Sequence, residues 1–313
     1  MQLLKYLIRR LFETIPVLIV ISLLVFLMIH LIPGDPAVVM LGGRATPEAL
    51  ENLRVEMGFK DPLYIQYFHF LKNLFSLNLG KSIYYHVPVF DLISSRLGVT
   101  LNLIIFTALI AITLTVPLAI YSADHRNRAG DQIIRVLGLV GICAPGFWLA
   151  ILLMLAFSIK IPIFPIGGYS SGFLNVVKSL FLPALTLSFG MIAILVRSLR
   201  SSLIDVLKTD YVAFDRVKGI SKARLMVRHV LRSGLISTVT LLGVNLSWLV
   251  GGTLAVEKVF ALPGIGVLMI ESISSRDYPV IQGVTLVFAL LVVFINILTD
   301  LSYSVLDPRV NLE

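Results

Sequence analysis

Residues 197–232 read RSLRSSLIDVLKTDYVAFDRVKGISKARLMVRHVLR, and this stretch lies between two long apolar runs. It carries nine Lys/Arg and three acids, whereas residues 181–196 and 233–256 on either side carry no charged residue. Charged side chains are costly in the hydrocarbon core of a bilayer. We therefore predict that the stretch is an aqueous loop between two membrane helices, and that the rest of the chain is organised as such helices.

The composition is that of a membrane protein. Of the 313 residues, 57% are hydrophobic and 14% are charged, whereas soluble domains are about half apolar and a quarter charged. A helix that crosses a bilayer needs about 20 apolar residues. The third helix is expected to be interrupted at Ala144-Pro145-Gly146, where Pro and Gly free backbone groups. We predict an all-α polytopic membrane protein with six transmembrane helices, at about residues 11–32, 99–123, 133–159, 181–199, 235–256 and 280–306.

Lys and Arg are distributed unevenly over the loops, and such residues favour the cytoplasmic side of a membrane. Three precede the first predicted helix and nine lie in the loop at 197–232, whereas residues 160–179 and 257–279 have two each. This bias predicts that both termini and the basic loop lie in the cytoplasm. It also explains the net charge of +8 without a nucleic-acid partner.

The longest polar stretch, residues 33–98, separates the first two predicted helices and is expected to form an extracytoplasmic cap. Thr46 followed by Pro47 and Glu48 is typical of a helix start, with Thr as the N-cap and Pro at the first position. Residues 64–79 are rich in aromatics and predict an amphipathic helix that lies on the membrane or packs on other helices. The whole of 1–313 is expected to form a single transmembrane domain.

The sequence offers no site that would supply energy or catalysis. Gly80-Lys81-Ser82 ends like a phosphate-binding P-loop, but the glycine that such a loop needs five residues earlier is replaced by Phe75. The five histidines are scattered without metal-ligand spacing. No predicted helix carries an acid at its centre, as an ion-coupled carrier would usually need. We therefore expect neither an enzyme nor a bound cofactor or metal.

Within the basic loop, residues 210–221 predict a short amphipathic helix that is stopped by Gly219. The loop has three interpretations: it determines orientation, it binds anionic lipid, or it docks on a cytosolic partner. Lipid binding needs only charge, whereas this helix also has aromatic and apolar residues that suit a groove in a partner. We favour docking, carried by Asp210, Tyr211, Val212, Ala213, Phe214, Asp215, Arg216, Lys218, Gly219 and Ser221.

A smaller set of residues is predicted to line a pathway through the membrane. Pro145, Phe147 and Trp148 follow the break in the third helix, and Asn245 and Trp248 lie in the fifth. Polar groups at this depth also form hydrogen bonds between helices, and that alternative stays open.

These features together resemble the inner-membrane permeases of ABC importers, in particular the first permease subunit of the dipeptide, oligopeptide and nickel group. The likeness covers nearly the whole chain, and it rests on the order and spacing of short motifs. In chain order they are Arg9-Arg10, Pro33-Gly34-Asp35-Pro36, Asp61-Pro62-Leu63-Tyr64, Leu79-Gly80-Lys81-Ser82, Pro145-Gly146-Phe147-Trp148, Leu182-Pro183-Ala184, Asp210 to Ser221, Glu257-Lys258-Val259-Phe260, Leu262-Pro263-Gly264-Ile265-Gly266, Arg276-Asp277-Tyr278-Pro279 and Leu306-Asp307-Pro308-Arg309.

The resemblance implies a fold, partners and a location. The chain would lie in the cytoplasmic membrane of a bacterium or archaeon and pair with a second, homologous permease. Two cytosolic ATPase subunits would hold ATP and Mg²⁺ and receive the coupling loop, residues 200–234, in a groove. A solute-binding protein would deliver di- or oligopeptides, with nickel or glutathione as alternative substrates. Residues Phe260, Pro263, Gly264 and Gly266 would gate the outer opening or contact the binding protein, unless they form a simple turn.

Two residues depart from the family pattern. Asp215 stands where a small residue is usual, and we expect it to pair with Arg216 or with a basic residue of the partner. Ser237 stands where a proline is common, which is expected to soften the start of the fifth helix. An autonomous secondary carrier or channel, and a lipid-binding scaffold, are the alternatives from other classes.

Overall fold

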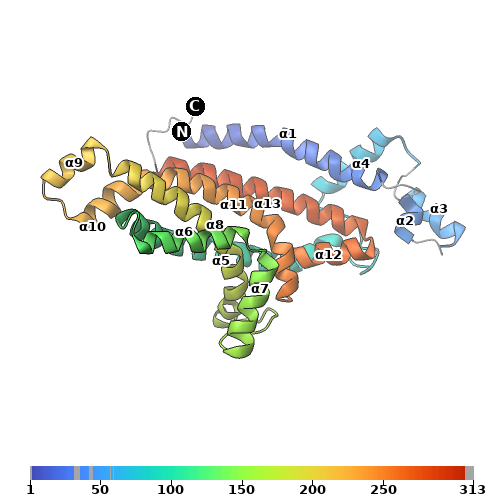
Figure 1. Cartoon of the computed structure of the whole chain (residues 1–313). Helices are drawn as coiled ribbons and strands as arrows, with labels where there is room; N and C mark the ends of the chain where they lie inside the picture. Colours follow the sequence, from blue (N-terminus) through green and yellow to red (C-terminus); the bar gives the residue numbers. More distant parts are fainter. Residues whose placement is uncertain (1, 32–35, 42–44, 57, 59, 307–313) are drawn as a thin grey trace. The chain divides into compact units, whose positions relative to one another are not determined.

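The computed structural model describes residues 2–31, 36–41, 45–56, 58 and 60–306 (Figure 1). Over these residues the chain is helical and has no β-strand, only an isolated bridge between Lys81 and Pro88. It divides into two compact units. Unit 1 holds residues 3–100 and 263–293, and unit 2 holds residues 101–262 and 294–313. The prediction of a single permease domain is not tested by this division and stays a prediction.

Five helices are long and apolar enough to cross a membrane. They are α1 (Gln2–His30), α5 (Val89–Asp124), α8 (Phe173–Val206), α11 (Leu231–Val259) and α13 (Tyr278–Leu306). All five were predicted from apolar runs. The predicted helix end at Pro33-Gly34-Asp35 and the C-terminal motif Asp307-Pro308-Arg309 lie outside the described residues.

The remaining predicted span is a bent pair of helices. The helix α6 (Ala129–Cys143) is followed by α7 (Gly146–Met154), which continues into the π-helix η1 (Leu155–Lys160), and the two directions differ by 109° (Figure 1). The break falls at the predicted residues, because Pro145 lacks a backbone N–H and holds the preceding Ala144 extended, with ψ 128°. The count of six spans is reached when this pair is taken as one.

Several helices extend beyond their predicted bounds. The helix α5 begins at Val89, so the last ten residues of the segment predicted as a cap, 89–98, are its first turns. The helix α8 exceeds the predicted 181–199 at both ends. Apolar runs mark only the part of a helix that lies in hydrocarbon, whereas the backbone hydrogen-bond ladder continues into water.

Unit 1 contains the small helices α2 (Pro36–Leu41), α3 (Pro47–Glu56), α4 (Leu63–Phe75) and α12 (Ile265–Ser275). The N-cap prediction is confirmed, because the Ala49 N–H donates to Thr46 Oγ1 over 3.2 Å. The helix α4 ends at Phe75 rather than at residue 79. One face of α4 packs on α1, where the Tyr67 ring centroid lies 5.4 Å from that of Phe26. Packing on another helix is therefore the interpretation that holds for this face of α4.

The core of unit 1 joins the start of α5 to α12 and α13. Its fully or nearly buried members are Val89, Ile93, Ile265, Leu268, Val280 and Val284. Gly283 allows the close approach, since a Cβ there would lie 2.8 Å from Val89 Cγ1. The short α12, which the sequence placed in an outside loop, is thus part of a packed core.

Unit 2 is built around α8. In its most apolar window α8 is 61% buried, whereas no other single span exceeds 33%. It packs on α6, α7 and α11. Small residues bring α6 and α8 together, since a Cβ on Gly141 would lie 2.8 Å from the Phe189 ring. Such contacts are typical of helix pairs in membranes, where close backbone approach replaces the hydrophobic drive available in water.

Candidate functional site

The predicted short helix in the basic loop is present as α9 (Asp210–Val217), at the end of unit 2 where α8 stops (Figure 1). Thr209 precedes it with an extended ψ of 150°, and Asp210 places a carboxylate in the first turn, where the helix dipole favours it. Gly219 has a φ of +78°, and the N–H of Gly219 donates to the Arg216 carbonyl over 3.0 Å. Gly219 therefore ends the helix by the left-handed conformation expected of it.

The helix α9 has two unlike faces. Val212 is fully buried against the unit, whereas Phe214 is 60% exposed and Val217 is 86% exposed. Tyr211 is also exposed, and Lys218 Nζ lies 4.3 Å from the centre of the Phe214 ring, in a cation–π contact. We call Tyr211, Phe214, Val217 and Lys218 the outer face of α9. Its two aromatic side chains are of the kind enriched in protein interfaces, and they lie beside an exposed apolar and a basic group.

Asp215 belongs to the other face, whereas the sequence predicted that it pairs with Arg216 or with a basic residue of the partner. Its carboxylate Oδ2 lies 3.5 Å from His229 Nδ1 on the π-helix η2 (Met226–Val230), and its side chain is only 18% exposed. The expected pairing with Arg216 is replaced by this contact within the loop, because the turn at Gly219 folds the chain back on α9. Arg216 instead lines a hollow behind the helix.

That hollow has a volume of about 470 Å³ and separates α9 from the ends of α5 and α8. Asp124 at the end of α5 and Lys222 at the start of α10 (Lys222–Leu225) form an ion pair at its wall. The loop is thus attached to unit 2 by Val212 and by charged pairs at its edges. Ser221 is the exposed residue that precedes α10, while Ala213 is exposed on α9.

Beneath the loop, a buried ion pair ties three helices together. Asp131 in the first turn of α6 is fully buried, and it accepts two hydrogen bonds from Arg200, Nε to Oδ1 over 2.7 Å and Nη2 to Oδ2 over 2.6 Å. Ser122 of α5 and the N–H of Asn127 (2.9 Å) also donate to the same carboxylate. A bidentate arginine–carboxylate pair fixes geometry as well as charge. The pair therefore fixes the ends of α5, α6 and α8 from which the loop extends.

Sequence reasoning missed this pair, because both residues were assigned to loops and counted only as charges. No local motif marks the pair, because its two residues lie 69 positions apart in the chain.

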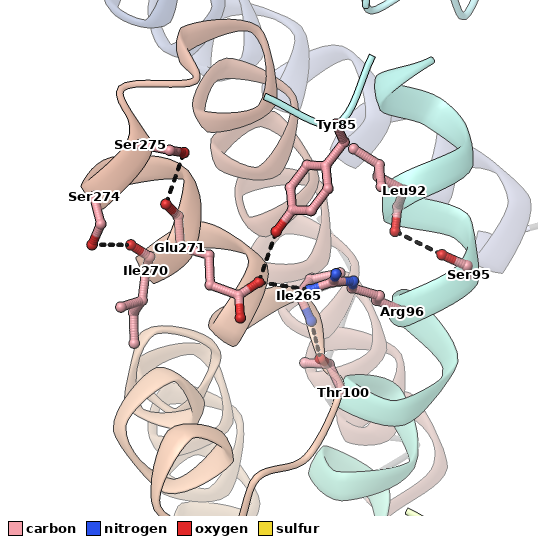
Figure 2. A network of polar contacts seen from close by, with 10 residues as sticks. All are labelled: Tyr85, Leu92, Ser95, Arg96, Thr100, Ile265, Ile270, Glu271, Ser274 and Ser275. Carbon is pink, nitrogen blue, oxygen red and sulfur yellow. Dashed lines mark hydrogen bonds and ion pairs between the residues drawn. The ribbon is translucent and has the colours of Figure 1, made fainter. Parts of the chain in front are cut away.

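In unit 1, polar contacts hold α12, whose start contains residues predicted to gate the pathway (Figure 2). Gly264 is the extended residue before α12, and the N–H of Ile265 donates to Thr100 Oγ1 of α5 over 3.0 Å. One helical turn earlier on α5, Arg96 Nη1 donates to Glu271 over 3.2 Å. Thr100 thus caps a helix whose own N-cap residue has no side chain.

Tyr85 adds a second donor to Glu271, over 3.0 Å from its hydroxyl (Figure 2). Burial raises the pKa of the Tyr85 phenol, and its hydrogen bond to the Glu271 carboxylate raises this pKa further. The phenol therefore stays protonated and continues to donate. Figure 2 shows that Arg96 of α5 and Tyr85, in the loop before α5, both bind the Glu271 side chain of α12.

The same loop binds a second carboxylate, that of the fully buried Asp277. The Ser82 hydroxyl donates to it, and the N–H groups of Ile83 and Tyr84 each donate over 3.2 Å. The P-loop-like Gly80-Lys81-Ser82 thus leads into a turn whose donors hold an internal anion. This arrangement gives a physical reason for the motif that the sequence left without one.

The four predicted gate residues lie in different surroundings. Phe260 is only 2% exposed, and its carbonyl accepts from the Gly168 N–H over 2.9 Å. Pro263 is exposed, whereas Gly264 and Gly266 are buried. Their role as a gate or as a contact for a binding protein stays a prediction.

The predicted pathway residues fall on two helices of unit 2. Pro145 precedes α7, and Phe147 and Trp148 in its first turn are exposed. On α11, Trp248 is exposed and Asn245 Nδ2 donates to the Leu241 carbonyl over 2.7 Å. This bond lies within α11, so it is not the bond between helices that the alternative described. Both that alternative and the lining role of all five residues stay predictions. Ser237 is inside α11, where its hydroxyl lies 2.9 Å from that of Ser202.

In the part of the chain that the structure describes, no group of three or more His, Cys, Asp or Glu is placed to hold a metal ion. The apolar spans and the exposed α9 define the chain as a polytopic α-helical membrane protein that presents a helix outside its spans.

Comparison with known families assigns the chain. Residues 115–312 match the family described as binding-protein-dependent transport system inner membrane component, and residues 3–104 match the N-terminal family of the same systems. The chain belongs to the inner membrane components of binding-protein-dependent transport systems.

Relatives support this assignment over nearly the full length. The chain is 38% identical over 308 residues to a putative peptide transport system permease protein of Brucella suis, which covers 97% of this chain and 98% of the relative. It is 38% identical over 307 residues to the glutathione transport system permease protein GsiC of Escherichia coli O6:H1, covering 98% and 99%. The fold resembles the MetNI methionine ABC transporter in an inward-facing conformation, with a TM-score of 0.59, 15% identity, and coverage of 69% of this chain and 96% of that chain.

These matches confirm the predicted ABC-importer permease family and the all-α polytopic fold. They also confirm that the chain is a membrane transport subunit rather than an enzyme. Membership of this family implies an ATPase partner and a solute-binding partner.

Proposed function

We propose that the chain is the first of two homologous permeases in an importer of di- or oligopeptides, and that α9 docks in the cytoplasm on one of two ATPase subunits. The observation that carries the docking proposal is the outer face of α9, which keeps aromatic and apolar side chains in solvent. An amphipathic helix of this kind suits a groove on a partner. ATP and Mg²⁺ would be held by the partner subunits.

The attachments of α9 supply a route for force. Val212 and the Asp124–Lys222 pair attach the loop to the rest of unit 2, and the Asp215–His229 contact holds α9 to η2 within the loop. Displacement of α9 by an ATPase would thus act on the ends of α5 and α8, which the Asp131–Arg200 pair holds together. The proposed role of the chain is to convert that displacement into a change of access through the membrane.

The docking proposal is tested with the double variant Tyr211→Ala, Phe214→Ala in the assembled transporter. We expect the variant to insert normally and to lose co-purification with the ATPase subunits, because anchors of this type each cost more than about 1 kcal/mol when truncated. The matched control is Phe75→Ala, an exposed aromatic at the end of α4 in unit 1. Undiminished co-purification of the double variant would reject the docking surface.

The cytoplasmic position of α9 rests on the excess of Lys and Arg in its loop. A cysteine at the exposed Ala223 of the same loop, outside the outer face of α9 and with the native Cys143 replaced by Ser, tests it. We expect an impermeant thiol reagent to label this cysteine in inverted membrane vesicles and to leave it unlabelled in intact cells. Labelling in intact cells but not in inverted vesicles would show that α9 lies outside the cytoplasm.

Peptides are proposed as the substrate class from the names of the relatives, and glutathione is itself a tripeptide that one relative transports. Uptake of a labelled dipeptide, glutathione and nickel should be compared in cells that carry the complete transporter. Dependence of peptide uptake on this chain supports the proposal, whereas uptake of nickel alone would replace it.

A further inference from the structure

A second hollow in unit 2 differs from the one behind α9, since its wall is almost wholly apolar. It has a volume of about 320 Å³ and lies between α5, α6 and α8. Leu114 of α5, Ile142 of α6 and Phe189 of α8 are among the apolar side chains that line it. Three arginines, Arg135, Arg197 and Arg200, complete the lining.

The register of α6 against α8 places these arginines at one end of the hollow. The two helices run antiparallel, because Asp131 contacts Arg200 whereas Gly141 approaches Phe189. In this register Arg135 is level with Arg197, and both are near the first turns of α6. From Arg197 back to Leu185 the wall extends about 18 Å along α8, at 1.5 Å per residue. The hollow is therefore basic at one end, and its wall is apolar along the rest of its length.

The basic end carries more positive charge than its single acid can neutralise. Asp131 is buried between Arg200, which it binds in bidentate fashion, and Arg135, whose Nε lies 3.9 Å from Oδ1. Arg197 is exposed. Three guanidinium groups thus face one carboxylate, which leaves an excess of two positive charges at the mouth of the hollow.

We propose that this hollow binds one acyl chain of an anionic membrane phospholipid, with the phosphate of its headgroup held by Arg135 and Arg197. Guanidinium groups match the geometry of phosphate oxygens, and the apolar wall accommodates a chain that stays in a hydrocarbon environment. An apolar helix of another subunit would fill the same wall but would not neutralise the excess positive charge of Arg135 and Arg197. Charge complementarity therefore selects the lipid. The proposal does not depend on the transported substrate or on docking at α9.

The charge half of the proposal is tested on the purified, assembled transporter by native mass spectrometry with added phosphatidylglycerol or phosphatidylcholine. The double variant Arg135→Gln, Arg197→Gln is expected to lose about 25-fold in affinity for phosphatidylglycerol, since each basic residue near anionic lipid contributes about fivefold. Its binding of phosphatidylcholine is expected to stay unchanged. The matched control, Arg224→Gln with Arg232→Gln, removes two arginines of the basic loop that do not line the hollow.

The apolar half is tested by Leu114→Trp, which narrows the hollow from α5, against Leu109→Trp, an exposed position of the same helix outside it. We expect only Leu114→Trp to displace bound phosphatidylglycerol. The variant Arg135→Lys, Arg197→Lys keeps the charge, so it is expected to retain more lipid than the Gln pair and shows that the site is intact.

Three results would overturn the proposal. The first is equal retention of phosphatidylglycerol by the wild type and by the Gln pair at Arg135 and Arg197. The second is equal loss of phosphatidylglycerol in the control pair at Arg224 and Arg232, which would indicate general attraction to the basic loop. The third is a disulfide between a cysteine introduced at Leu118 and a cysteine introduced in the second permease. This disulfide would show that the second permease covers the hollow.

Discussion

The α12 region of unit 1 buries its carboxylates among hydrogen-bond donors, whereas the α9 loop of unit 2 exposes apolar and aromatic side chains. Around α12, carboxylates are held inside the unit, as Asp277 is by Ser82 and two backbone N–H groups. On α9, Phe214 and Val217 remain in solvent, and one buried side chain, Val212, anchors the helix. The first region supplies donors for its buried carboxylate from within unit 1, whereas the second leaves apolar and aromatic side chains in solvent. We infer that the hydrogen bonds around α12 stabilise unit 1, and that α9 binds another protein.

The sharpest test of this contrast is Asp277→Ala. The substitution leaves the Ser82 hydroxyl and two N–H groups without an acceptor, so we expect a loss of about 3 kcal/mol in the free energy of unfolding. Thermal unfolding of the purified transporter measures it. The control is Asp91→Ala, an exposed acid in the first turn of α5, for which we expect a change within about 0.5 kcal/mol. Equal stability of the two variants would contradict a structural role for the Asp277 network.

Substituting one glycine in each region tests both regions at the same backbone conformation. Gly219 after α9 and Gly80 before Ser82 both have a φ of +78°, and a Cβ added at either residue would meet no atom within 4 Å. Valine at either site costs about 1–2 kcal/mol from the left-handed conformation alone. We expect both variants to insert, and only Gly219→Val to uncouple ATP hydrolysis from uptake in proteoliposomes. Normal uptake by Gly219→Val would show that α9 does not couple ATP hydrolysis to uptake.

Tyr85→Phe measures the α12 network through its pH dependence. The variant loses one hydrogen bond to Glu271, which is expected to cost about 1 kcal/mol. Because the pKa of Tyr85 is raised in the folded protein, its contribution is fully present below the ordinary tyrosine pKa of about 10 and is lost as pH rises through the raised value. As pH rises above the ordinary tyrosine pKa of about 10, the free energy of unfolding should therefore fall more steeply for the wild type than for Tyr85→Phe. Parallel curves would show that Tyr85 does not titrate as proposed.

The smallest stability effect is expected at the Asp124–Lys222 pair beside α9. Lys222 is largely exposed, so Lys222→Gln should change the free energy of unfolding by less than about 1 kcal/mol. We nevertheless expect a severalfold fall in uptake per ATP hydrolysed, because the pair attaches the loop to α5. The exchanged variant Asp124→Lys, Lys222→Asp should restore much of the coupling. If it restores none, the pair does not transmit motion.

Much of the fold was predictable because bilayer crossing requires long apolar runs, and five such runs appear as five helices. The α9 helix and its end at Gly219 were predictable because helix signals are local in sequence. The break at Pro145 was predictable for the same reason, but its bend of 109° was not, since that angle depends on packing against α8.

The contacts that position the site were not predictable, because each joins residues far apart in the chain. Asp131 meets Arg200, and Glu271 meets Arg96 and Tyr85, only after the helices have packed. Asp215 is the clearest example. The sequence predicted a pairing with Arg216 or with a basic residue of a partner, whereas the turn at Gly219 brings His229 to it from within the loop. Spacing along one helix does not reveal which face the next turn of chain will cover.

The turn at Ile83 and Tyr84 has a consequence for how the molecule meets small anions. Its hydroxyl and N–H donors form a receptor for a negatively charged oxygen, and Asp277 of the same chain already occupies it. A receptor filled by its own chain is closed to phosphate, sulfate and nucleotide, however closely its sequence imitates a nucleotide-binding loop. Adding such anions to the transporter is therefore expected to leave this turn undisturbed.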